Sequence, residues 1–192
     1  MSRGYSLVEV LVVLVLLALV AGATLPFALA TLDRSRTAGA ARYLSSRLML
    51  ARFEAVNQSA FVAVQFVQRV DGYWFRTYVD GNGNGVLARD ISRGTDRPLG
   101  PEQRLDQQFS GVTFGICPGV TAVVPGDPFD VSDPIQIGQS TVMSFNPNGS
   151  STAGTLFIRG AGATQFAVRV LGVTARSRIF HFDFSDGTWR TP

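Results

Sequence analysis

The sequence contains no lysine, one cysteine and one histidine among its 192 residues. A single cysteine, Cys117, excludes a disulfide bond within the chain, and one histidine with one cysteine cannot form the usual zinc site of several such ligands. His181 lies between Phe180 and Phe182, where a structural role is predicted, and no motif marks a catalytic nucleophile. We therefore predict that the chain is not an enzyme.

All 17 basic residues are arginine, and the net charge is +3. The guanidinium group offers a planar fork of donors that suits carboxylate or phosphate partners. A bias in genome composition would produce the same arginine usage, so the count alone does not identify a partner.

Charge is missing altogether from residues 10–23. The apolar segment over residues 5–29 is near the roughly 20 residues that span a bilayer as a helix. Three interpretations compete for it. The first is a secretory signal cleaved at the small residues Ala21-Gly22-Ala23. The second is a plain membrane anchor. The third is a prepilin segment, which is cut before the apolar stretch and keeps that stretch in the mature protein.

Glu9 favours the prepilin interpretation. A carboxylate at the edge of an apolar helix is costly and suggests a function, which neither a signal peptide nor a plain anchor needs. Cleavage after Gly4 would expose a cationic amine on Tyr5, and Glu9 of one subunit could pair with that amine of its neighbour. Removing one partner of such a buried pair typically costs about 3–5 kcal/mol, which is enough to select subunit register.

The run Gly4-Tyr5-Ser6-Leu7-Val8-Glu9 resembles the class III signal of type IV pilins and type II secretion pseudopilins, with Tyr5 where phenylalanine is usual. The resemblance implies cleavage after Gly4 by the prepilin peptidase and N-methylation of Tyr5. It also implies a single-pass protein of the bacterial inner membrane, with its head in the periplasm, that assembles into a pilus or pseudopilus.

The fold class predicted is α+β, with a leader over residues 1–4, a helix over 5–58 and a β-rich head over 59–192. A kink or local melting is expected at Pro26. Further along, apolar residues spaced by three and four form the face that packs on the head, namely Leu32, Ala41, Leu44, Leu48, Ala51 and Ala55.

The head is expected to be an antiparallel sheet, since its segments are rich in β-branched and aromatic residues and are separated by turn residues. Asp71-Gly72 predicts a hairpin between the first two strands. Long irregular loops are expected over residues 80–110 and 117–139. The strands are predicted over 61–68, 73–79, 112–116, 141–145, 155–159, 165–171 and 176–183.

The run Phe145-Asn146-Pro147-Asn148-Gly149 and the strands after it resemble the C-terminal half of the GspH/FimT pseudopilins. This resemblance implies a minor pseudopilin of type II secretion, whose partners are other pseudopilins or pilins, the prepilin peptidase and the inner membrane. The alternative that it implies is a minor type IV pilin of the FimT kind, which binds DNA for uptake.

Two candidate binding sites lie in the head. Asp80, Asn82 and Asn84 alternate with glycines as in the first half of a calcium-binding EF-hand loop, and Asp90 is a further candidate ligand. Ile91 occupies the position where such a loop needs a bidentate glutamate. A turn rich in Gly and Asn would use the same residues. The segment is therefore either a calcium site or a turn without a ligand, and the sequence suggests no other cofactor.

Arg176 and Arg178 form the second candidate site. On a strand, residues two apart share one face, where both guanidinium groups could contact DNA phosphates. In FimT-like proteins a Gly-Arg-x-Arg pattern at this place is implicated in DNA binding, and this chain has Ala175 in place of the glycine. The alternative is a solvated strand face that pairs with Asp183 or Asp186.

Overall fold

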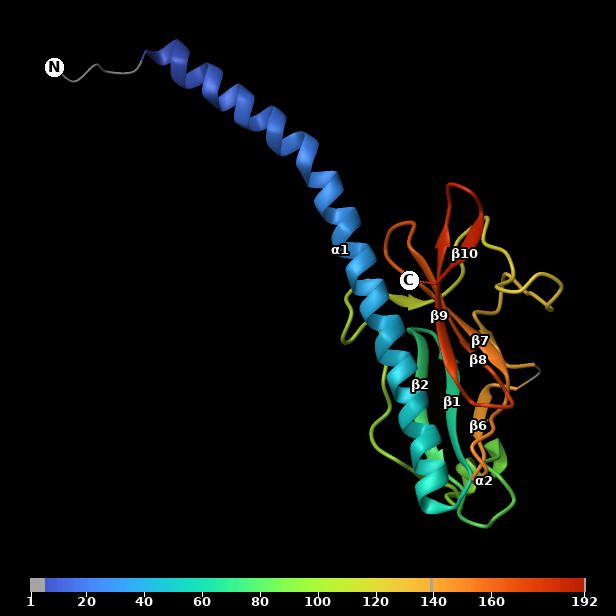
Figure 1. Ribbon diagram of the computed structural model, residues 1–192. Helices are drawn as coiled ribbons and strands as arrows, with labels where there is room; N and C mark the ends of the chain where they lie inside the picture. The colour runs from blue at the N-terminus through green and yellow to red at the C-terminus, as the bar shows by residue number, and fades with distance from the viewer. Residues whose placement is uncertain (1–5, 139, 192) are drawn as a thin grey trace.

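The computed structural model describes residues 6–138 and 140–191, which form one long helix and a β-rich head (Figure 1). Helix α1 runs from Leu7 to Gln58. It ends at Ser59, whose left-handed backbone (φ 50°) allows its N–H to bond to the carbonyl oxygens of Ala55 and Val56. The predicted α+β class, with a long N-terminal helix and an antiparallel head, is confirmed.

The local melting expected at Pro26 is wrong. Helix α1 continues through Pro26 without a break, and Figure 1 shows only a gentle curve along it. Proline removes one backbone donor, and the alanine and leucine residues that flank it are strong helix formers. We infer that the flanking turns hold the helix together across the missing hydrogen bond.

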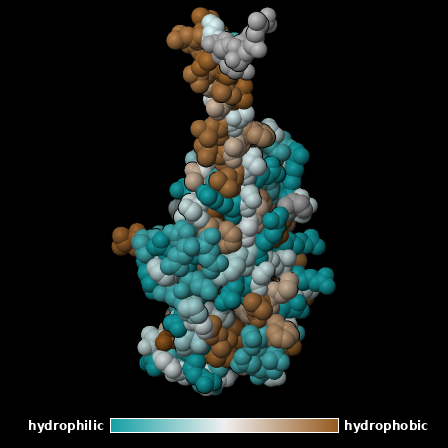
Figure 2. Space-filling model, turned by 90° about the vertical axis from the view of Figure 1, so that its left-hand side faces the viewer, coloured by the Kyte–Doolittle hydropathy of each residue, from teal (hydrophilic) through white to brown (hydrophobic). Residues whose placement is uncertain are grey.

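The two halves of α1 have different surroundings. From Leu7 to Leu32 the large apolar side chains are exposed, and Figure 2 shows them as the brown column above the head. From Thr37 onwards one side of the helix is buried against the head. The predicted buried stripe is confirmed for Ala41, Leu44, Leu48, Ala51 and Ala55, whereas Leu32 is 44% exposed.

The head consists of two antiparallel sheets. Their strand orders are β3-β2-β1-β6 and β10-β9-β8-β7-β4, and β5 pairs with β7 off the second path. The predicted hairpin at Asp71-Gly72 joins β1 to β2, with Arg69 opposite Gly72. The strand bounds are β1 Val62–Arg69, β2 Gly72–Val79, β3 Arg97–Pro98, β4 Thr113–Phe114, β5 Ile135–Gln136, β6 Val142–Phe145, β7 Gly154–Arg159, β8 Gln165–Val170, β9 Ser177–Asp183 and β10 Thr188–Arg190.

Each predicted strand overlaps an observed one, although β4 is only two residues long. The segments expected to be irregular are partly ordered. Helix α2 (Ala88–Arg93) and β3 lie within the first of them, and β5 lies within the second. These elements, and β10, are too short to leave a periodic signal in the sequence.

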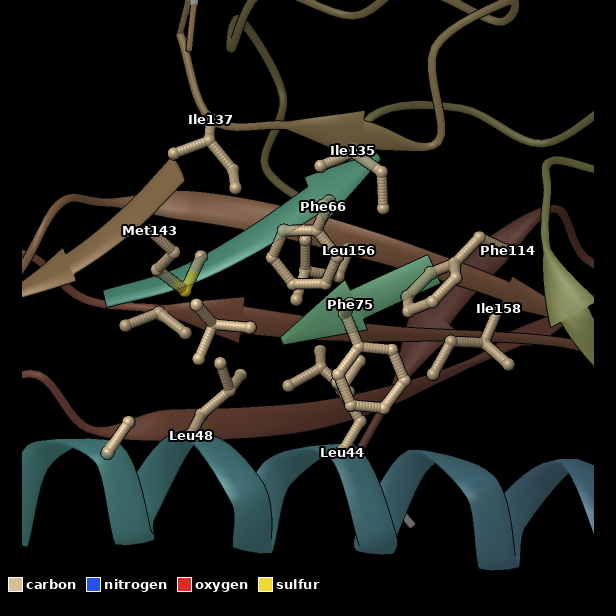
Figure 3. Packing of buried hydrophobic residues seen from close by; sticks show 14 of the residues in the cluster. Leu44, Leu48, Phe66, Phe75, Phe114, Ile135, Ile137, Met143, Leu156 and Ile158 are labelled. Atoms are coloured by element: carbon tan, nitrogen blue, oxygen red, sulfur yellow. The ribbon is translucent and has the colours of Figure 1, made fainter. Parts of the chain in front are cut away.

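The main hydrophobic core lies between α1 and the two sheets. Figure 3 shows Leu44 and Leu48 of α1 pointing towards the apolar side chains of both sheets. Phe66, Phe75, Met143, Leu156 and Ile158 belong to the same cluster and are each at most 3% exposed.

A second, smaller cluster covers the other face of the second sheet. Phe157 and Phe182 of this sheet pack there with residues from the segment that follows β4, including Cys117, Val120 and Phe129. Neighbouring residues of a strand point to opposite faces, so Leu156 faces α1 while Phe157 faces this segment. Helix α1 and the 117–133 segment therefore lie on opposite sides of the second sheet.

Candidate assembly, metal and nucleic-acid sites

Glu9 lies in the first turn of α1, and its side chain is exposed. The partial positive charge at a helix N-terminus stabilises a carboxylate placed there. Gly4 and Tyr5, the predicted cleavage site, lie outside the described residues. Helix α1 is long and apolar enough to cross a membrane by its length and composition. The arrangement therefore joins a carboxylate to an apolar helix half that the head leaves uncovered.

The head makes a close contact with α1 where the exposed apolar half of the helix ends. The Asp33 carboxylate accepts a hydrogen bond from the backbone N–H of Ala161 at 2.8 Å. A Cβ atom on Gly160 would collide with this carboxylate and lie 2.5 Å from Thr37 Oγ1. The glycine thus permits a close approach between the β7–β8 turn and the helix. The sequence indicated only a turn here, because nothing in it revealed that Asp33 would be the partner.

The candidate calcium loop is closed by its own carboxylates. Asp80 Oδ1 accepts the N–H groups of Asn82 and Gly83, both at 2.9 Å, and Oδ2 accepts that of Gly85 at 2.7 Å. These bonds satisfy the turn without a ligand.

The other candidate ligands are used in a similar way. The Asn84 side-chain amide donates to Asp90 Oδ2 at 3.2 Å, and Asp96 accepts the N–H groups of Gly81 and Leu87. Within residues 6–138 and 140–191, no group of three or more His, Cys, Asp or Glu side chains is placed to hold a metal ion. The contacts are those of a turn rich in Gly and Asn, and calcium binding at this loop stays a prediction.

Arg176 and Arg178 are both exposed. Strand β9 begins at Ser177, so the predicted strand starts one residue too early and Arg176 precedes it. The Ser177 hydroxyl bonds to that of Ser45 on α1 at 2.7 Å, which places the flanking Arg178 side chain on the face away from the helix.

The acidic residues predicted to pair with Arg176 and Arg178 form ion pairs with a different arginine. Asp183 and Asp186 both form ion pairs with Arg190. Ala175, which replaces the glycine of the FimT-like pattern, adopts a positive φ of 49°, a conformation that favours glycine. A glycine would adopt this backbone conformation at Ala175 without strain.

His181 and Cys117 have the surroundings of structural residues. The His181 ring packs on Phe166, with ring centroids 5.0 Å apart. Burial lowers the pKa of His181, as do the charges of Arg34 and Arg190. Burial also raises the pKa of the Cys117 thiol, which disfavours the reactive thiolate.

Comparison with known families accounts for most of the chain. Residues 40–174 match the family model of the type II transport protein GspH, and residues 1–25 match that of the prokaryotic N-terminal methylation motif. The chain belongs to the GspH family. The predicted resemblance to pilin-like GspH/FimT proteins is therefore confirmed, and the methylation motif includes the positions of Gly4, Tyr5 and Glu9. Membership implies a structural pilin-type subunit that assembles with other pilins, is processed by the prepilin peptidase and is anchored in a membrane.

The chain is similar to a solved structure, that of the type IV minor pilin FimU of Pseudomonas aeruginosa. It is 19% identical, with a TM-score of 0.46, over 83% of this chain and 95% of that one. No curated protein matches the chain significantly in sequence.

Proposed function

We propose that this GspH-family chain is a minor pseudopilin of a type II secretion system, a structural subunit of the filament that assists protein export. The observation that carries the proposal is the division of α1 into an exposed apolar half and a half packed into the core. The first half requires a membrane or a filament core around it. The second half, which is packed into the core, attaches the head to the first half.

Processing follows from the N-terminal motif. The prepilin peptidase cleaves after Gly4, and the new terminus on Tyr5 is methylated. In the filament, Glu9 of each subunit pairs with the Tyr5 amine of a neighbour, and the pair is neutral within the apolar core. Before assembly the chain crosses the bacterial inner membrane once, with its head in the periplasm.

Deleting the gene for this chain distinguishes a role in type II secretion from a role in a pilus that takes up DNA. Deletion is expected to reduce export of type II substrates into the medium and to leave transformation by exogenous DNA unchanged. The measurement is the ratio of a secreted enzyme in the medium to that in the periplasm. Normal export with lost transformation would contradict the secretion role and support the alternative.

The alternative is a DNA-binding minor pilin for natural transformation. The specific observation in its favour is the pair of exposed arginines Arg176 and Arg178, which make no ion pair within the described residues and follow the glycine-like backbone at Ala175. Arginines in such a position can contact successive phosphates.

Under this alternative, Arg176→Gln/Arg178→Gln is expected to weaken DNA binding and to lower the slope of log K against log[salt] by roughly 2, about 0.9 for each lost phosphate contact. The measurement is a titration of labelled duplex DNA with the full-length protein in detergent at several salt concentrations. The matched control is Arg89→Gln/Arg93→Gln, which removes two exposed arginines from α2. Equal effects of the two double variants, or no binding at low salt, would eliminate this function.

A further inference from the structure

The apolar half of α1 and the head meet without a linker. From Val10 to Leu32 the sequence has no charged residue, which is about 35 Å of helix at 1.5 Å per residue. The hydrocarbon core of a bilayer is about 30 Å thick. When α1 spans the membrane as proposed, the next residues, 33–36, therefore lie among the lipid headgroups. Because Asp33 is bonded to Ala161 of the head, the head lies directly against that membrane surface.

Arg34 and Arg36 carry positive charge at this level. Both side chains are exposed, and neither forms an ion pair within the described residues. The carboxylate between them and the span, that of Asp33, accepts the hydrogen bond from the head. Arginines beside a span usually lie on its cytoplasmic side, whereas these two lie on the side of the head. Their position therefore calls for a different explanation from the usual topology bias.

A groove of about 500 Å³ lies beside Arg36, between α1 and the head. One wall is apolar and comes from the exposed half of the helix, with Leu29 and Leu32. The other wall consists of Ser110 and the β7–β8 turn over residues 161–164. The groove thus places apolar side chains at the depth of acyl chains, and a guanidinium group and a hydroxyl at the depth of phosphates.

The β9–β10 turn adds an exposed aromatic side chain at the same end of the head. Phe184 is 43% exposed and packs on Phe182, with ring centroids 4.9 Å apart. Figure 1 shows this turn, in red, at the end of the head nearest the exposed half of α1. Its carboxylates, Asp183 and Asp186, are paired with Arg190. Arginines together with exposed aromatic and apolar side chains are typical of surfaces that bind anionic membranes.

We propose that this end of the head binds the headgroup of an anionic phospholipid while the chain is in the membrane. Arg34 and Arg36 contact the phosphate, and an acyl chain lies along Leu29 and Leu32. The attraction of an anionic membrane for arginine falls off within a Debye length, so only charges at this level contribute. The lipid holds the head in one orientation until the subunit leaves the bilayer for the filament. This inference rests on the membrane insertion within the proposed function and names a partner that precedes assembly.

Lipid binding to the full-length chain in detergent tests the site. Native mass spectrometry is expected to show more bound phosphatidylglycerol than phosphatidylcholine at equal concentration. Arg34→Gln/Arg36→Gln is expected to lower the affinity for phosphatidylglycerol about thirtyfold, roughly fivefold for each arginine. The matched control is Arg93→Gln/Arg97→Gln, which removes two exposed arginines near α2 and is expected to leave the affinity nearly unchanged.

A depth measurement shows separately whether the head lies at the membrane surface. The chain is placed in phosphatidylcholine vesicles that contain lipids with a nitroxide on the headgroup. In a Cys117→Ala background, a fluorophore on Ser185→Cys of the β9–β10 turn is expected to be strongly quenched. The same fluorophore on Ser92→Cys is expected to be quenched weakly, because α2 lies at the opposite end of the head (Figure 1). Both serines are exposed.

Three results would overturn the proposal. They are equal binding of the two lipids, equal losses in the two double variants, or displacement of the lipid by an equimolar amount of inorganic phosphate. If the fluorophore at position 185 is quenched while the lipid preference is absent, membrane insertion stands and the lipid site alone fails. If neither position is quenched, the chain is not inserted as proposed and both fail.

Discussion

Replacing Glu9 by valine is expected to reduce incorporation of the chain into filaments at least about a hundredfold while leaving cleavage after Gly4 intact. The substitution leaves the amine of Tyr5 in a neighbouring subunit without its carboxylate in an apolar core. An unpaired buried charge costs about 3–5 kcal/mol, and each 1.4 kcal/mol changes an equilibrium by about tenfold. The measurement is the fraction of the chain that sediments with sheared filaments compared with the fraction left in the membrane.

The matched control is Glu54→Val on the same helix. This substitution removes an equal charge. The Glu54 carboxylate, however, lies beyond the apolar half of α1, where it accepts a hydrogen bond from Gln58 at 2.8 Å. Its replacement is expected to leave incorporation nearly unchanged. Normal incorporation of Glu9→Val would show that the carboxylate has no part in assembly.

Leu44→Ala is expected to destabilise the head by about 2–5 kcal/mol, the usual cost of a leucine-sized cavity in a core. Leu44 is fully buried between α1 and both sheets (Figure 3). Since this core is what attaches the helix to the head, the loss should appear as a lower midpoint of urea unfolding. The measurement is the near-ultraviolet circular dichroism of the chain in detergent against urea concentration.

Leu50→Ala provides the comparison, because it makes the same chemical change six residues further along the helix at a side chain that is 50% exposed. We expect a loss within about 0.5 kcal/mol, as for most surface positions. If the two variants lost equal stability, α1 would not be held by the core described here.

Much of the fold could be predicted from the sequence because long elements leave periodic patterns. The apolar run, the stripe from Ala41 to Ala55 and the hairpin at Asp71-Gly72 each depend on local residues, and each lies where it was expected. Pro26 was misjudged, since the rule for proline describes one lost hydrogen bond and not the strength of the turns around it.

The sites were less predictable, because they depend on residues distant in the sequence. The bond from Ala161 to Asp33 joins positions 128 apart, and no local pattern could indicate it. The calcium motif was recognised from spacing alone, which could not show that the Asp80 carboxylate accepts hydrogen bonds from the backbone of its own loop. Likewise, the pairing of Arg190 with Asp183 and Asp186 became visible only once β9 and β10 were placed side by side.

The central claim is that this chain is a processed, membrane-inserted pilin-type subunit, and mass spectrometry of its mature N-terminus tests that claim most directly. The account predicts a chain that begins with N-methylated Tyr5 and retains the whole of α1. A mature protein that begins at Thr24, after the small residues of an ordinary signal peptide, would contradict it, because the head would then have lost the helix half through which it assembles.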